Sequence, residues 1–217
     1  MSDESGVERT AAGPVVTLRL LTICGSLQAR SANRAALVVI ESASARIGAT
    51  VEAFADLEGI PAFNADRAEP APPAVAALRT QLAAADAVVI AAPEYAGGVA
   101  GAVKNATDWI VGTGELYAKP VAVVSCGTSG GEHACRQLVQ SLTWQGAHVV
   151  ADLGIAAPRT KSDDDGRFTD PATLAALEQV AAVVVAAPGL PADERRALVA
   201  GVIVTYGIDE GHLAPFT

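Results

Sequence analysis

The sequence predicts an α/β fold in which a doubly wound parallel sheet of five strands carries helices on both faces. Five apolar, β-branched-rich runs recur along the 217 residues with helical patterns between them. Hydrophobic residues make up 51% of the chain and aromatic residues only 4%, so Val, Leu, Ile and Ala form most of the core. Such a core is typical of parallel strands that are buried on both faces. The length fits one large domain.

The five strands are expected, in chain order, at residues 15–24, 50–56, 87–92, 121–126 and 147–153. The first helix should begin near Asn33, with either Ser31 or Asn33 as its cap. Another helix is expected over residues 132–145, because four apolar residues share one stripe and Gly146 follows. A third should start at Asp170, a capping residue that is followed by proline.

Three segments outside these elements have distinct compositions. Residues 1–14 are acidic and small, unlike a secretory signal, and are predicted to form a mobile tail before a domain over residues 15–187. Residues 188–217 form an extension that includes the apolar "VIVTYGI", which we expect to pack on this domain or on a neighbouring subunit. The segment "RTKSDDDGRFTD" is predicted as a solvated turn, since Ala172 stands where a calcium loop needs glutamate. No metal site is predicted.

Composition also limits the possible partners. The net charge of −9, without any cluster of Lys or Arg, argues against nucleic-acid binding. The strongest apolar runs are much shorter than the ~20 residues that span a bilayer, so no membrane association is expected. The three cysteines, Cys24, Cys126 and Cys135, form no C-x-x-C pair and favour a reducing, cytoplasmic location.

Three loops follow strands at the carboxyl edge of the predicted sheet, where ligands of open parallel sheets bind. They read "CGSLQARSAN", "APEYAGG" and "SCGTSGG". The first offers Ser26, Arg30, Ser31 and Asn33 around a helix start and lacks both the dinucleotide and the P-loop patterns. These groups suit a monophosphate, although ordinary serine capping of a helix explains them equally well.

Two of these stretches resemble a known family. "GSLQARSAN" and "PEYAGGVAGAVKNATDW" are similar to the patterns G-S-L-R-x-x-S-x-N and P-E-Y-N-x-x-x-P-G-x-L-K-N-A-I-D-W of NAD(P)H-dependent FMN reductases, which include quinone and chromate reductases. The resemblance extends over residues 18–187. It implies a flavodoxin-like sheet of order 2-1-3-4-5, FMN as cofactor, NAD(P)H as electron donor, and a homodimer or homotetramer.

The resemblance also assigns roles to individual residues. Those implied to hold the FMN phosphate are Ser26, Ser31 and Asn33, and those implied to line the isoalloxazine ring are Pro93, Glu94 and Tyr95. Gln28 stands in place of the family's phosphate-binding arginine, so Arg30 would have to reach the phosphate. Ala96 replaces an asparagine, which leaves the backbone amides of Ala96 and Gly97 as possible ring contacts.

The third loop supports two different interpretations. In a flavin enzyme, glycine-rich backbone at Gly127, Thr128, Gly130 and Gly131 would let amides at the next helix start approach the pyrimidine end of the ring. The same "GTSGG" matches the G-x-S-x-G of serine hydrolases, and Asp170 and His212 follow Ser129 in the Ser-Asp-His order. The chain is short for that fold and has no HGGG-type loop.

These observations together predict an FMN-dependent oxidoreductase that takes hydride from NAD(P)H and reduces a small acceptor such as a quinone or free flavin. No side-chain acid or base is expected, because the cofactor supplies the chemistry. The alternatives are a flavodoxin-like electron carrier and, less favoured, the hydrolase built on Ser129. Lys104, Asn105, Asp108 and Trp109 are expected to serve packing and subunit contact.

Overall fold

The apolar runs form one parallel sheet at the centre of the molecule. The computed structural model describes residues 17–216. The sheet has the order β2-β1-β3-β6-β7, and every neighbouring pair is parallel. Its strands are β1 (Arg19–Cys24), β2 (Thr50–Phe54), β3 (Ala87–Ala91), β6 (Pro120–Gly127) and β7 (His148–Ala156). This confirms the predicted order 2-1-3-4-5.

The strand positions were predicted well, whereas several strand ends were not. β3 is buried at every residue, as its unbroken apolar run indicates. β1 begins at Arg19 rather than at residue 15, since residues 17 and 18 lie outside the strand and residues 15 and 16 lie outside the described residues, as does the predicted tail. β7 extends three residues beyond Leu153 because it stays paired with β6 as far as Ala156.

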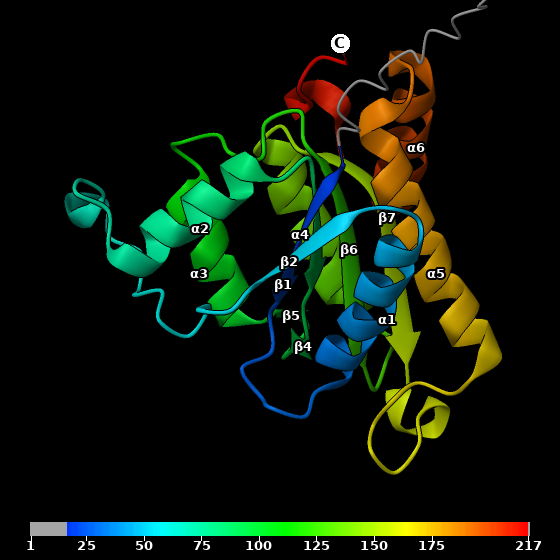
Figure 1. The fold of residues 1–217 in the computed structure, drawn as a ribbon. Coiled ribbons are helices and arrows are strands. Elements are labelled where there is room, and N and C mark those ends of the chain that lie inside the picture. Colours follow the sequence, from blue (N-terminus) through cyan, green and yellow to red (C-terminus); the bar gives the residue numbers. More distant parts are fainter. Residues whose placement is uncertain (1–16, 217) are drawn as a thin grey trace, which may run out of the picture.

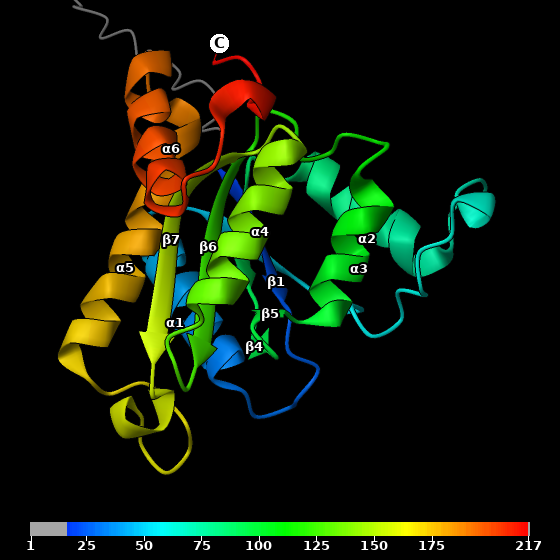
Figure 2. The same cartoon turned by 180° about the vertical axis from the view of Figure 1, so that it is seen from behind.

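Helices cover both faces of the sheet (Figures 1 and 2). The helices α1 (Ala32–Arg46) and α5 (Pro171–Ala186) pack against each other on one face. The helices α2 (Pro73–Ala84), α3 (Gly101–Ile110) and α4 (Glu132–Trp144) cover the other face. Short 3-10 turns occur at Ala65–Arg67, Pro158–Lys161, Ala187–Gly189 and Glu210–His212.

α3 carries the residues that were expected to serve packing. Trp109 is 1% exposed, and its indole N–H donates to the carbonyl of Pro61 at 2.8 Å. Asn105 accepts from the Phe63 amide at 2.8 Å and donates to the Pro61 carbonyl at 2.9 Å. The two side chains therefore fix the segment between β2 and α2 on the core, which accounts for both residues within one subunit.

The chain beyond α5 forms a helix, which the sequence left open as a helix or a strand. α6 (Ala192–Tyr206) packs on β7 through the buried side chains of Val199, Val202 and Ile203. It ends at Gly207, whose φ of 62° is a conformation that glycine adopts without strain. Within the apolar "VIVTYGI", Val202 and Ile203 thus cover the edge of this domain's own sheet, whereas Val204 is 74% exposed.

α5 and the turn after it form an apolar stretch that is longer than the short apolar runs of the sheet. By length and composition alone, residues 171–189 could span a membrane. In the structure, Leu177, Val180, Ala181 and Val184 are buried against the sheet and α1. An apolar face buried in this way is what a core helix of a globular α/β protein requires.

Candidate functional site

An open groove of about 1420 Å³ lies at the carboxyl edge of the sheet, where β1, β3, β6 and β7 end. These ends and their loops lie at the lower side of Figure 1. Nine of the predicted site residues line it: Ser26, Arg30, Ser31, Asn33, Pro93, Glu94, Tyr95, Gly127 and Thr128. Four others, Ala96, Gly97, Gly130 and Gly131, lie beside it in the same loops without lining it.

The loop after β1 presents backbone donors at the start of α1. Ser31 is the cap of α1, because its hydroxyl accepts from the Arg34 amide at 3.1 Å. The Ser26 hydroxyl accepts from the Gln28 amide at 3.3 Å. Within residues 17–216, the amides of Arg30, Ser31 and Ala32 have no acceptor. Free amides at the positive end of a 15-residue helix are a ready binding site for an anion.

Asn33 ties the first loop to the third instead of capping α1. Its side-chain oxygen accepts from the Cys126 amide at 3.0 Å, and its side-chain nitrogen donates to the Cys126 carbonyl at 3.3 Å. Asn33 is buried, and both ends of its amide are used in this contact. The side chain therefore fixes the start of α1 against the end of β6.

The loop after β3 is a tight hairpin. Its strands are β4 (Glu94–Tyr95) and β5 (Gly98–Val99), which pair antiparallel. The two residues between them, Ala96 and Gly97, both have positive φ, at 51° and 72°. Two-residue hairpins favour this conformation, and asparagine or glycine adopts it more easily than alanine. The family's asparagine at this position thus has a backbone explanation that does not require a ligand.

Glu94 fastens this hairpin to the start of α4. One carboxylate oxygen accepts from the amides of His133 at 2.8 Å and Ala134 at 3.2 Å. The other accepts from the Ser129 hydroxyl at 3.1 Å. Desolvation works to raise the pKa of Glu94, but the hydrogen bonds from Ala134, Ser129 and His133 outweigh it and hold this pKa below its ordinary value. Glu94 is therefore a carboxylate cap supplied from another loop.

In the loop after β6, the backbone conformation and close packing require glycine. Gly131 has a φ of 73°, and a Cβ there would lie 2.1 Å from the Ser125 hydroxyl. The amides of His133 and Ala134 are already bound by Glu94, so the start of α4 is less open than the sequence suggested. Among the described residues, the amides of Thr128 and Ser129 keep no acceptor. They are among the donors that this loop can offer to a ligand.

A fourth loop also lines the groove, although the sequence predicted only three loops at this edge of the sheet. Residues 157–168 follow β7, and the Ala157 amide donates to the Gly127 carbonyl at 3.1 Å. Asp163 closes the turn by accepting from the amides of Asp165 and Arg167 at 3.0 and 2.8 Å. The predicted turn is present, but it forms a wall of the groove. Because this loop follows a strand of the parallel sheet, its position in the sequence could have predicted that it lies at the ligand-binding edge.

The hydrolase interpretation is wrong, because its three residues do not meet. Ser129 precedes the first turn of α4 and is bonded to Glu94. His212 stacks on Trp144, the last residue of the same 13-residue helix, which puts it about 20 Å from Ser129. Asp170 caps α5 by accepting from the amide and hydroxyl of Thr173. In the described part of the chain, Ser129, Asp170 and His212 therefore do not form a catalytic triad.

The buried thiols do not take part in the site as nucleophiles. Cys126 and Cys135 are buried, and desolvation raises the pKa of each thiol to about 12. Both remain protonated at neutral pH and pack as small apolar groups.

Comparisons with known proteins place the chain in a family. An NAD(P)H-dependent FMN reductase of Pseudomonas aeruginosa is 35% identical over 171 residues, which cover 75% of this chain and 90% of that protein. A probable NADPH:quinone oxidoreductase of Oryza sativa is 35% identical over 188 residues, or 80% of this chain and 92% of the relative. The solved NAD(P)H:(acceptor) oxidoreductase of Paracoccus denitrificans superposes with a TM-score of 0.66 at 25% identity, covering 78% of this chain and 96% of that one.

A family model described as NADPH-dependent FMN reductase matches residues 18–161. This range includes the first three loops of the groove and the fourth loop as far as Lys161. The match confirms the resemblance carried by "GSLQARSAN" and "PEYAGGVAGAVKNATDW". This chain therefore belongs to the NADPH-dependent FMN reductase family.

Proposed function

We propose that the protein is an FMN-dependent oxidoreductase that uses NAD(P)H to reduce a quinone, free flavin or similar small acceptor. The observation that carries the proposal is that two sets of free backbone amides lie in loops beside one groove. Free amides at residues 30–32 suit a phosphate, and free amides at Thr128 and Ser129 suit a polar ring edge. Family membership supports the same cofactor and the same donor.

The residues present fit a monophosphate better than a pyrophosphate. Ser26 and Ser31 supply hydroxyls beside the free amides at the start of α1. Asn33 would act indirectly, by holding that helix start against β6. The first loop has none of the glycine spacing that lets backbone approach a bridging diphosphate. These groups would hold the phosphate end of FMN.

The second and third loops would hold the ring. Pro93, Glu94 and Tyr95 would form one wall, with the hairpin amides of Ala96 and Gly97 beside it. Bound FMN supplies the redox chemistry, since it can accept hydride from NAD(P)H and pass electrons to an acceptor. The amides of Thr128 and Ser129 would stabilise negative charge at the ring's polar edge without moving, because β6, Ala157 and Asn33 fix their loop.

A spectrum and one anaerobic mixing experiment test this function. Purified protein, or apo-protein reconstituted with FMN, should show flavin absorbance, and NADH or NADPH should bleach it on a catalytic timescale. A colourless preparation that takes up no FMN would refute the proposal. Flavin that binds but is reduced only slowly would instead indicate the electron carrier.

Three further features belong to the same proposal. Residues 15–187 would form the flavin-binding domain and residues 188–217 an extension that covers the edge of its sheet. The enzyme would act in the cytoplasm as a homodimer or homotetramer. Two exposed apolar side chains in the loops around the groove support self-association, since Tyr95 is 60% and Leu27 55% exposed. Light scattering after gel filtration would test it, and a monomer at micromolar concentration would contradict it.

A further inference from the structure

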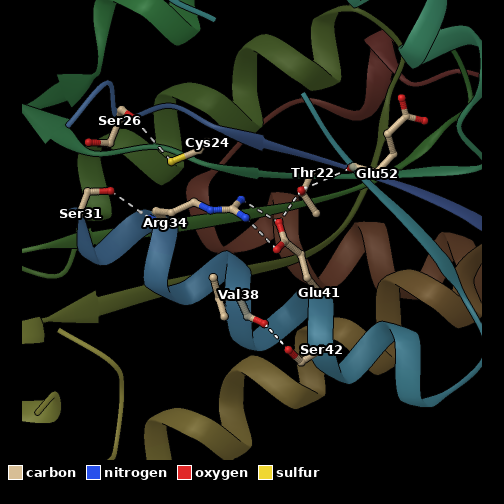
Figure 3. A network of polar contacts seen from close by, with 9 residues as sticks. All are labelled: Thr22, Cys24, Ser26, Ser31, Arg34, Val38, Glu41, Ser42 and Glu52. Atoms are coloured by element: carbon tan, nitrogen blue, oxygen red, sulfur yellow. Dashed lines mark hydrogen bonds and ion pairs between the residues drawn. The ribbon is translucent and has the colours of Figure 1, made fainter. Parts of the chain in front are cut away.

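The arginines of the groove differ in whether a carboxylate already binds them. Five line it: Arg30, Arg34, Arg46, Arg159 and Arg167. Arg34 is held on both nitrogens by Glu41, at 2.8 and 3.0 Å, and Glu41 also accepts from the Thr22 hydroxyl at 2.7 Å (Figure 3). This bidentate pair keeps the Arg34 guanidinium on the flank of α1, where it is already neutralised.

Two more arginines are paired at short range. Arg46 donates to Glu178 at 2.6 Å, which links α1 to α5 at the far end of the groove. Arg167 lies 3.2 Å from Asp165 within its own turn. Arg30 reaches the same carboxylate only at 4.0 Å, and its side chain is 82% exposed. Each of the four thus has a carboxylate partner.

Arg159 is the exception. It is exposed, and within residues 17–216 its side chain has neither a hydrogen-bond acceptor nor an ion-pair partner. Its backbone is nevertheless well fixed, because it lies in the 3-10 turn Pro158–Lys161, which Ala157 joins to the end of β6. The Arg30 to Asp165 contact brings this loop to the first loop. An uncommitted guanidinium therefore lies in the same groove as the free amides of residues 30–32.

We propose that Arg159 binds a phosphate monoester of a ligand held in this groove, an inference that rests on the proposed function. A guanidinium matches such a phosphate in charge and in the spacing of its paired donors. Two sources share this chemistry: the 5′-phosphate of FMN and the 2′-phosphate that distinguishes NADPH from NADH. In a protein of net charge −9, a local unpaired cation matters for holding either one.

The test compares ligands that differ only in the phosphate. Apo-protein is titrated with FMN and with riboflavin, followed by flavin fluorescence, and the FMN-loaded enzyme is assayed with NADPH and with NADH. The variant is R159Q, and the matched control is R46Q, which removes an equal charge from the same groove at a guanidinium bound by Glu178. Circular dichroism melts check that each variant folds.

If Arg159 binds the FMN phosphate, R159Q weakens FMN binding about 10-fold or more and leaves riboflavin binding within about 2-fold. If it binds the NADPH phosphate, kcat/KM for NADPH falls about 10-fold or more while that for NADH is kept. R46Q should change neither the ratio of the FMN to the riboflavin affinity nor the ratio of kcat/KM for NADPH to that for NADH. The inference is overturned if R159Q resembles R46Q in both arms, or if R159Q weakens FMN and riboflavin equally and also lowers kcat/KM equally for NADPH and NADH. Wild-type protein that binds neither flavin would overturn the proposed function itself.

Discussion

Replacing Glu94 tests whether its carboxylate is the cap of α4. In Glu94→Ala, the amides of His133 and Ala134 and the hydroxyl of Ser129 lose their acceptor. Losing a helix cap costs about 1 kcal/mol, and the lost charge at the helix's positive end adds roughly 0.5 kcal/mol. The Ser129 bond adds about 0.5 kcal/mol more, at the low end of the usual range because Glu94 is only half-buried. The free energy of unfolding of the variant should be lower than that of the wild type by about 2 kcal/mol.

Glu94→Gln separates the hydrogen bonds from the charge. The amide oxygen can still accept from the His133 and Ala134 amides, so the expected loss is only about 0.5–1 kcal/mol. The assay is urea unfolding of apo-protein, with Glu58→Gln as the control. Glu58 is an exposed carboxylate that has no side-chain partner within residues 17–216. A Glu94→Ala protein as stable as the wild type would refute the capping role.

The pH dependence gives a second, independent check on Glu94. Its pKa in the folded protein is lowered from 4.5, so its contribution is present at neutral pH and is lost as the pH falls through that lowered pKa. The stability gap between wild type and Glu94→Gln should therefore be constant from pH 7 to about pH 5 and should shrink below about pH 4. A gap that stayed the same down to pH 3 would show that the charge does not contribute.

Three further substitutions test the local geometry, all by urea unfolding at neutral pH. Ala96→Asn should stabilise the protein by about 0.5–1 kcal/mol, because asparagine tolerates the positive φ at this position; a loss of stability would contradict the hairpin conformation. Ser31→Ala should destabilise by about 1 kcal/mol through loss of the α1 cap, and an unchanged midpoint would argue against that cap. Asn33→Ala should cost more, about 2–3 kcal/mol, because it leaves the buried backbone groups of Cys126 without partners; a smaller effect than that of Ser31→Ala would contradict the bridge.

The sheet and the location of the groove could be predicted because their signals are local. The apolar run at residues 87–91 is buried on both faces as one strand, and "APEY" marks the point where it ends. The partners of the site residues could not be predicted in the same way. Glu94 and His133 are 39 residues apart and Asn33 and Cys126 are 93 apart, so nothing in the sequence around one indicates the other. The choice between Ser31 and Asn33 as the cap depended on that long-range bridge.

The segment over residues 126–131, at the end of β6 and just after it, is where the other walls of the groove meet. Asn33 joins it to the first loop, Glu94 joins it to the hairpin, and Ala157 joins it to the loop after β7. Most surface loops accept inserted residues readily, because nothing else depends on their length. Here one added residue would shift three walls relative to one another. The four loops should therefore open as one cooperative unit. Because they are already held in place, ligand binding would cost little conformational entropy of the loops.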